Sequence, residues 1–367
     1  MVRVTEDVFG IAVNPMSQKS EHIRRFTLSS EKGMSVSILT LGGIVQSIKV
    51  PDHNGKLEDV CLGYDDVAGY YRNQKFYFGA MVGRVANRIA RGEFKMCDKD
   101  VRLSRNFKDR YHLHGGYVGF DSVIWDVVGI HKDGVTMQHI SPDGHEGYPG
   151  EVTVNINFSL NDAGCFGMRI EARAKATTCI NIANHAYFNL AGHGTGKDTL
   201  MQHMVMIKAS KLVDTDQDLI PTGKLMPVRN TPYDFSTLTN LGKRINQVSR
   251  CPICGFDNSY CTDVDPNLVK LVARAVHPCS GRYMEVHTNQ PALQFYTANN
   301  LPDEEAGDVE NIGKDGSHYV QHGAFCLETL KYPDAMNNPE FPSIMLNPGQ
   351  LYDHQVVYRF GACPKRV

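Results

Sequence analysis

The sequence predicts an all-β protein, built as a large antiparallel β-sandwich or barrel with few short helices. Apolar and polar residues alternate with a period of two along much of the 367-residue chain. Gly and Pro turn signals separate these stretches at short intervals, and helical patterns are scarce. Many short strands divided by turns are typical of both architectures, so periodicity alone leaves them as alternatives.

Residues 152–174 contain the clearest hairpin. Alternating apolar residues run through both halves, and the turn at 161–164 joins them, so one face is expected to be buried. A second hairpin is predicted at 269–276 and 283–287, around the turn Pro278-Cys279-Ser280-Gly281. Further strands are expected at residues 35–41, 44–50, 205–208 and 355–360.

Two segments predict short helices. They are residues 65–71 and residues 238–248, and the second has Leu238, Leu241 and Ile245 at near-helical spacing. No internal repeat, linker or shift in composition marks a boundary. Although the length would allow two domains, we expect a single domain over residues 1–367.

Composition excludes several classes of function. The hydrophobic content of 42% and charged content of 21% are ordinary for a globular protein. The net charge of −2 offers no electrostatic footprint for nucleic acid or an anionic membrane. No secretory signal or membrane-spanning run is visible. We therefore expect a cytoplasmic monomer that binds neither nucleic acid nor membrane.

The ten cysteines show no repeating spacing, so reduced thiols are the expected state. Cys251 and Cys254 match a C-x-x-C pattern. A zinc site would need a second such pair, which Cys261 and Cys279 do not supply. No role is assigned to Cys251 and Cys254.

His185 is the first candidate for chemistry. It lies in the apolar and aromatic segment 184–190, just after an alternating stretch, and histidine exchanges protons near neutral pH. A lone histidine in such a place is more often a satisfied core residue. Other polar groups strengthen the functional interpretation, namely His114, the pair Asn87-Arg88, and Glu328.

The apolar stretch at residues 77–90 contains Arg84 and Arg88. A buried, unpaired guanidinium is costly, so each should meet a carboxylate or face a polar cleft. A structural ion pair and a ligand-binding arginine fit the local sequence equally well.

His112 and His114 are spaced to lie on one face of a strand, as in a metal-binding pair. The expected carboxylate does not follow them, so we expect no metal. Gly115-Gly116 follows instead, and it would permit close approach of a ligand to the backbone.

Asp257, Gln294 and Glu328 complete the polar set, with Glu328 expected at the end of an apolar strand over 323–327. The chain has no Gly-x-Ser-x-Gly elbow, phosphate-binding loop or dinucleotide fingerprint. Carboxylate, imidazole and amide groups without a nucleophile motif indicate proton transfer among hydroxyl groups.

Several motifs in order resemble the aldose 1-epimerase (galactose mutarotase) family, and are closest to its animal type. The resemblance covers residues 8–361, and its motifs are Gly83-Arg-Val-Ala-Asn-Arg-Ile89, Leu113-His-Gly-Gly116, the segment 141–150, Asn184-His-Ala-Tyr-Phe-Asn-Leu190, Phe325-Cys-Leu-Glu-Thr329, Pro333-Asp-Ala335 and Asn347-Pro-Gly349. It implies a β-sandwich of the galactose mutarotase type with a sugar cleft across one sheet. It also implies interconversion of the α and β anomers of D-galactose and D-glucose without a cofactor.

The resemblance also implies roles for residues. His185 would be the general acid and Glu328 the general base, and the sugar-binding groups would be Asn87, Arg88, His114, Asp257 and Gln294. The chain departs from the family pattern at Ala186, Leu330 and Asn258-Ser259, and the last two departures could alter sugar preference.

Three alternatives remain at this point. A hexose-6-phosphate 1-epimerase would need extra cations, for which Arg84 and Arg88 are candidates. A non-catalytic carbohydrate-binding protein would not need the proton-transfer pair. A retaining glycosidase would need facing carboxylates such as Asp257 and Glu328. Burial would raise the pKa of Glu328 and Arg88 would oppose that rise, and the sequence leaves the balance open.

Overall fold

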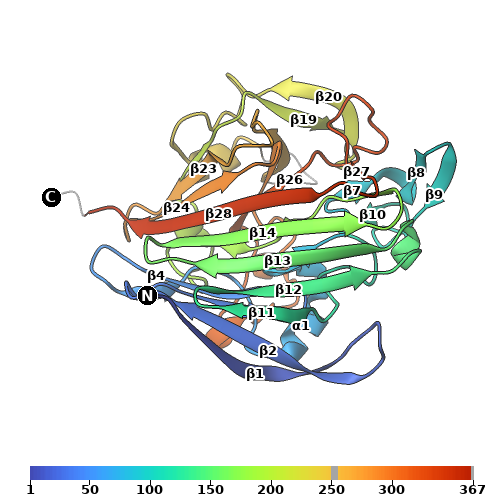
Figure 1. Cartoon of the computed structure of the whole chain (residues 1–367). Helices are drawn as coiled ribbons and strands as arrows, with labels where there is room; N and C mark the ends of the chain where they lie inside the picture. Colours follow the sequence, from blue (N-terminus) through green and yellow to red (C-terminus); the bar gives the residue numbers. More distant parts are fainter. Residues whose placement is uncertain (249–254, 365–367) are drawn as a thin grey trace.

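The computed structural model describes residues 1–248 and 255–364, and strands dominate this part of the chain (Figure 1). The largest sheet is antiparallel and nine-stranded, and in Figure 1 its strands β11 to β14 and β28 run side by side. In spatial order it consists of β11 (Asp126–His131), β12 (Gly134–Ser141), β13 (Val152–Leu160), β14 (Cys165–Ala174), β28 (Tyr352–Ala362), β24 (Arg282–Thr288), β23 (Lys270–Val276), β18 (Met204–Ile207) and β21 (Thr239–Asn240).

A six-stranded sheet forms the second layer, and it carries much of the candidate site. Its spatial order is β17 (Tyr187–Phe188), β26 (Phe325–Leu330), β25 (Ala292–Tyr296), β22 (Asp257–Cys261), β19 (Lys211–Thr215) and β20 (Pro221–Pro227). All of its pairings are antiparallel.

Smaller elements complete the described part of the chain. The N-terminal sheet has five strands, β1 (Arg3–Val13), β2 (Ser20–Ser29), β3 (Ser35–Leu39), β4 (Val45–Pro51) and β5 (Leu57–Asp59). The two-stranded pairs are β6 (Met81–Val82) with β16 (Ala183–Asn184), β7 (Arg88–Ile89) with β10 (His112–Leu113), β8 (Glu93–Met96) with β9 (Lys99–Arg102), and β15 (Thr178–Cys179) with β27 (Met345–Leu346). The α-helices are α1 (Val67–Arg72), α2 (Gly196–Leu200) and α3 (Leu241–Ile245).

The main hydrophobic core lies between the two large sheets. Alternate residues of β13, β14 and β28 pack against alternate residues of β17, β25 and β26. Across this interface the rings of Phe188 and Tyr358 meet edge to face at 5.4 Å, and the Tyr358 hydroxyl donates to Leu327 O at 3.3 Å. The predicted all-β fold is thereby confirmed, and the layered core is that of a sandwich.

The predicted hairpins are confirmed. β13 pairs with β14 in unbroken register from Val152 opposite Ala174 to Leu160 opposite Phe166. β23 pairs with β24, with one irregularity in register near Leu271. In β13, β14 and β24 the alternation seen in the sequence matches the alternation of burial, whereas in β23 the consecutive residues Val272 and Ala273 are both buried.

The helix predicted at residues 238–248 is wrong in its extent. Thr239 and Asn240 instead pair with β18, and the helix α3 spans only Leu241–Ile245. The Asn240 side chain accepts a hydrogen bond from Lys243 N and so caps the helix at this point. None of the helices in the described part of the chain is long and apolar enough to cross a membrane.

Candidate active site

The outer face of the six-stranded sheet carries a row of polar side chains. Asp257 comes from β22, Gln294 from β25 and Glu328 from β26, and Gln294 lies directly opposite Glu328 in the strand register. Their sequence neighbours Leu293 and Leu327 point the other way, into the core between the sheets. The alternation of side chains along each strand thus places apolar residues in the core and the polar candidate residues on the outer face.

Glu328 lies within a strand and not at its end, contrary to the sequence prediction. β26 continues through Thr329 and Leu330 because these residues remain paired with Leu293 and Ala292 of β25. The Thr329 hydroxyl also hydrogen-bonds His354 Nε2 at 2.7 Å on the facing sheet. Cys326 and Glu328 are two residues apart in this strand, so both side chains lie on its outer face.

His185 lies in the short link between β16 and β17. Its backbone N–H donates to Ala80 O at 2.8 Å, and its carbonyl accepts from Gly79 N at 3.0 Å. The neighbouring Asn184 side chain donates to Gly79 O at 2.7 Å. These bonds hold the imidazole against a segment about a hundred residues away, so its position is a tertiary feature.

Two hydrogen bonds join His114 and Asn87. The Asn87 N–H donates to His114 Nδ1 at 3.2 Å, and the His114 N–H donates to Asn87 O at 3.1 Å. Nδ1 is therefore an acceptor, and the His114 proton is on Nε2. Both residues have left-handed backbone, with φ of 63° at Asn87 and 50° at His114, a strained conformation that clusters at functional sites.

The expectation that His112 and His114 share a strand face is wrong. β10 ends at Leu113, and the left-handed backbone of His114 turns its ring away from that of His112. His112 is buried, with Nδ1 2.8 Å from Ser104 O and Nε2 2.6 Å from the Tyr148 hydroxyl. It is a satisfied core histidine.

Arg84 also differs from expectation, because its partners are backbone carbonyls and hydroxyls instead of a carboxylate. The side chain is fully buried, and its guanidinium donates to Gly150 O and Ser141 Oγ at 2.7 Å each. It also donates to the carbonyls of Pro142 and Pro149 at 3.1 Å. Arg84 therefore holds the 141–150 segment in place.

Every residue that the sequence analysis assigned to the site lines one cleft. The cleft has a volume of about 180 Å³, enough for a small ligand of several hydroxyl groups. Its lining consists of Lys75, Phe76, Tyr77, Asn87, Arg88, Asn106, Phe107, Leu113, His114, His185, Tyr187, Asp257, Gln294, Tyr296, Asn300 and Glu328.

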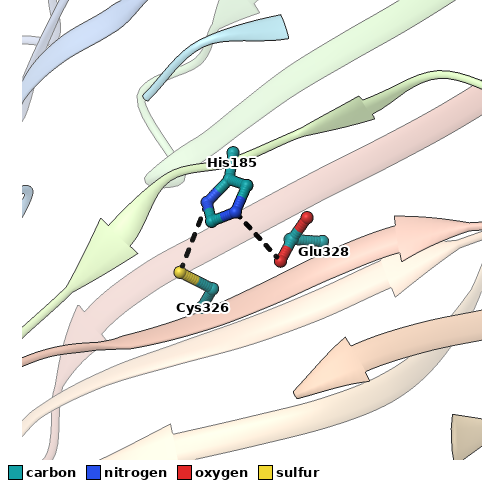
Figure 2. Close-up of side chains that lie close together, drawn as sticks. All are labelled: His185, Cys326 and Glu328. Atoms are coloured by element: carbon teal, nitrogen blue, oxygen red, sulfur yellow. Dashed lines mark hydrogen bonds and ion pairs between the residues drawn. The ribbon is translucent and has the colours of Figure 1, made fainter. Parts of the chain in front are cut away.

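His185 and Glu328 form the titratable pair of this cleft (Figure 2). Nε2 of His185 lies 3.8 Å from Oε1 of Glu328, and both side chains are buried. Burial lowers the pKa of His185 to about 4. Burial raises the pKa of Glu328 well above its ordinary value, Asp257 adds to the rise, and Arg88 opposes it without reversing it.

The polar floor of the cleft is held by a chain of contacts. Gln294 donates to Asp257 Oδ1 at 2.5 Å and accepts from the Ser259 hydroxyl. Asp257 Oδ2 lies 3.5 Å from Arg88 Nη2, and Arg88 in turn approaches Asn87 Oδ1 at 3.4 Å. This arrangement gives the cleft both hydrogen-bond donors and acceptors at fixed positions.

Sequence reasoning missed the aromatic walls of the cleft. The His185 ring stacks on Tyr187 at 5.0 Å and on Tyr77 at 6.0 Å, and Tyr296 meets it edge-on at 6.2 Å. Phe107 lies under the Arg88 guanidinium at 5.5 Å. Tyr187 is two residues from His185 and Tyr296 is two residues from Gln294, which were usable signals, whereas Tyr77 and Phe107 come from other segments.

One group of metal-type ligands occurs among the residues described, and it consists of His185, Cys326 and Glu328, with ligand atoms within 4.8 Å of one another. Cys326 Sγ approaches Nδ1 of the imidazole at 3.7 Å, whereas Glu328 approaches Nε2. The two side chains therefore flank opposite nitrogens, an arrangement suited to proton transfer (Figure 2). The C-x-x-C pair Cys251 and Cys254 lies outside the described residues.

The structure is thus a β-sandwich whose polar cleft holds an imidazole and a carboxyl group facing each other. The family model for aldose 1-epimerase matches residues 24–359. The chain therefore belongs to the aldose 1-epimerase family.

Relatives within this family match almost the whole chain. Galactose mutarotase of Rattus norvegicus is 41% identical over 360 residues, which is 98% of this chain and 99% of that protein. The human galactose mutarotase is 39% identical with the same coverage. Aldose 1-epimerase of Haemophilus influenzae is 32% identical over 86% of this chain and 88% of that protein.

Solved structures share the fold. An aldose epimerase homologue from C. elegans superposes with a TM-score of 0.82 at 25% identity, over 91% of this chain and 97% of that one. Galactose 1-epimerase from Lactobacillus acidophilus superposes with a TM-score of 0.80 at 20% identity, over 99% of both chains. At that identity the second match supports the fold alone.

Proposed function

We propose that the protein is an aldose 1-epimerase that interconverts the α and β anomers of free hexoses such as D-galactose and D-glucose. The observation that carries the proposal is the His185–Glu328 pair, 3.8 Å apart in the polar cleft of a family member. The reaction needs one group to remove a proton from the C1 hydroxyl and another to protonate the ring oxygen. A facing carboxyl and imidazole supply both.

Ring opening uses the charged form of the pair. The Glu328 carboxylate takes the proton of the C1 hydroxyl, and the electrons of that O–H bond form the C1 carbonyl. The bond from C1 to the ring oxygen breaks, its electron pair stays on oxygen, and His185 Nε2 protonates that oxygen. The aldehyde rotates about the C1–C2 bond, and closure by the reverse steps yields either anomer.

The pKa shifts fit this cycle. Both groups are buried, so the empty cleft favours neutral imidazole and protonated carboxyl. Moving one proton from Glu328 to Nε2 of His185 creates the charged pair, and ring opening then consumes those charges. Burial therefore favours the step that opens the ring, and the pair needs no net proton from solvent during the cycle.

The other assigned residues are suited to hold the sugar. His114 presents Nε2–H as a donor, Asp257 offers carboxylate oxygens, and Asn87 and Arg88 lie at the same side of the cleft. Hydroxyl groups bind by paired hydrogen bonds worth about 0.5–1.5 kcal/mol each, and more with a charged partner. We assign substrate binding to these residues together with Gln294.

The alternatives have less support. A phosphate group would need free cations, yet Arg84 is bound by carbonyls and Arg88 lies beside Asp257. A non-catalytic binding protein would have no use for the buried His185–Glu328 pair. For a glycosidase, Asp257 would have to be a free second carboxylate, but it accepts from Gln294.

We further propose that the protein acts as a monomer of a single domain in the cytoplasm. One chain supplies every residue that lines the cleft, so the site needs no partner copy. The cysteines described are free thiols, including buried Cys61, Cys179, Cys261 and Cys326, which suits a reducing compartment.

Polarimetry of freshly dissolved α-D-galactose tests the proposed activity. We expect the protein to accelerate the approach to equilibrium rotation far beyond the rate in buffer, in proportion to its concentration. Buffers also catalyse mutarotation, so the control is the Glu328→Gln variant at the same concentration. A wild-type rate no faster than that in buffer would contradict the proposed function, whereas equal acceleration by both proteins would contradict only the assignment of Glu328 as the base.

A further inference from the structure

The contact between Cys326 and the far side of the His185 imidazole is not used by the chemistry described above. Cys326 Sγ lies 3.7 Å from His185 Nδ1, within reach of a hydrogen bond that involves sulfur. The thiol is fully buried and is absent from the residues that line the cleft. Figure 2 shows it at the opposite edge of the ring from Glu328. It therefore contacts the catalytic imidazole without facing the ligand.

We propose that Cys326 is a positioning residue whose sulfur accepts a hydrogen bond from Nδ1–H of His185 and so reserves Nε2 for proton exchange with the sugar. This inference rests on the proposed epimerase function, because it assigns Nε2 as the nitrogen that shuttles the proton. The bond partner of one ring nitrogen determines which nitrogen carries the proton in neutral histidine.

The argument follows from the proton cycle. Nε2 faces Glu328 and gains and loses a proton in each turnover, so the permanent proton must be on Nδ1. A buried N–H needs an acceptor, and Sγ of Cys326 is placed to provide one. Without it, the neutral ring can hold its proton on Nε2, and that tautomer cannot accept a proton from the sugar.

A thiol differs from the usual carboxylate partner of a catalytic histidine. Burial raises the pKa of the Cys326 thiol well above its ordinary value, so the sulfur stays uncharged. An uncharged sulfur is a weak acceptor and gives little stabilisation to imidazolium. His185 is then held in one tautomer while remaining a strong acid when protonated.

The test compares Cys326→Ala and Cys326→Ser with a matched control, Cys61→Ala. Cys61 is also a buried thiol in the main core, and its sulfur contacts the carbonyls of Val45 and Leu62, with no imidazole. Its removal reproduces the loss of one buried sulfur. Serine keeps a group that can accept from Nδ1–H, whereas alanine has none.

Nitrogen NMR of ¹⁵N-histidine-labelled protein reads the tautomer directly and needs no sugar. The His185 signals are assigned as those missing from His185→Gln. We expect Nδ1 to be protonated in the wild type, in Cys326→Ser and in Cys61→Ala, and Nε2–H to gain population in Cys326→Ala. Wild-type protein with its proton on Nε2 would overturn the inference.

Kinetics give the second measurement. We expect Cys326→Ala to lower kcat about tenfold, a part of the 10²–10⁴ that a general acid contributes, while KM stays within about twofold. Cys326→Ser should recover most of kcat, and Cys61→Ala should match the wild type. A wild-type kcat in Cys326→Ala, or a loss of kcat with the tautomer unchanged, would overturn the inference. If the wild type itself fails to accelerate mutarotation, the proposed function is wrong. The NMR measurement would still show whether Nδ1 of His185 carries the proton that is proposed to hydrogen-bond to Cys326.

Discussion

His185 and Glu328 are 143 positions apart in the sequence, yet Nε2 of one lies 3.8 Å from Oε1 of the other. The imidazole comes from a link held against residues 79–80, and the carboxyl comes from the middle of β26. Burial shifts their pKa values in opposite directions, downwards for His185 and upwards for Glu328. One proton can therefore move within the pair without net charge entering the cleft.

The base assignment predicts that Glu328→Gln removes nearly all activity. The amide keeps the shape of the carboxyl group but cannot take a proton, so kcat should fall by about 10²-fold or more. Sugar affinity, measured by calorimetry, should stay within about an order of magnitude of the wild type. A variant that kept a tenth or more of the wild-type kcat would show that Glu328 is not the base.

The two neighbouring arginines should respond differently to lysine substitution. A lysine at position 84 cannot satisfy the carbonyls that Arg84 bonds, so Arg84→Lys should lower the free energy of unfolding by about 3 kcal/mol. Arg88→Lys should instead raise KM about tenfold and change stability little, because Arg88 lines the cleft. Urea unfolding and initial rates measure the two effects, and a reversal of the pattern would contradict the assignments.

The cleft predicts a preference for neutral sugars. We expect a higher kcat/KM on galactose or glucose than on glucose 6-phosphate, because Asp257 and Glu328 disfavour an added anion. Of the cleft cations described, Arg88 lies beside Asp257, which leaves Lys75 to meet a phosphate. Assays of the three substrates side by side measure this, and a preference for the phosphate would favour the hexose-6-phosphate alternative.

Activity should not depend on a metal ion. The proposed chemistry uses protons on His185 and Glu328, and the thiol and carboxyl groups flank opposite nitrogens of the imidazole. Dialysis against EDTA should therefore leave the rate unchanged, as measured by polarimetry. Lost activity that zinc or manganese restored would require a metal role for this cluster.

Asp121 predicts a pH-dependent change in stability. It is 7% exposed, Oδ2 accepts from Gln74 at 3.1 Å, and Oδ1 has no hydrogen-bond partner among the described residues. Burial raises its pKa from 3.8 to about 7. Between these values the folded protein holds a proton that the unfolded chain has released, so this group lowers stability as pH rises through that window.

Asp121→Asn should remove this effect, because the amide does not ionise. Relative to the wild type, the variant should gain up to about 4 kcal/mol in the free energy of unfolding at pH 8, and little near pH 4. Urea unfolding at both pH values measures the gain, with Asp126→Asn at an exposed position of β11 as the control. A gain at Asp121 that did not vary with pH would contradict this account.

Local patterns predicted much of the fold. The alternation in residues 152–174 predicted β13 and β14, because a strand with one buried face repeats every two residues. The same reasoning failed at residues 238–248, where apolar spacing suited a long helix. There the Asn240 side chain caps the helix, a local signal that the apolar spacing overlooked, and the pairing of Thr239 and Asn240 with the distant strand β18 fixes the residues before it as a strand.

The sequence motifs predicted which residues line the cleft, but they did not predict what surrounds each residue. Arg84 and Arg88 look alike in the sequence, since both interrupt one apolar stretch. The structure separates them, because the 141–150 segment wraps around Arg84 while Arg88 reaches Asp257. His112 and His114 diverge in the same way, at the left-handed backbone of His114.

The sequence by itself determined the strand class of the fold and the kinds of groups available for chemistry, because periodicity and residue type are local properties. The tertiary structure decided which of these groups meet. Burial sets the pKa values of His185 and Glu328, and the thiol of Cys326 reaches Nδ1 only once β26 lies beside the link that carries the imidazole. Desolvation and distance depend on the packing of segments far apart in the chain, so no local pattern contains them.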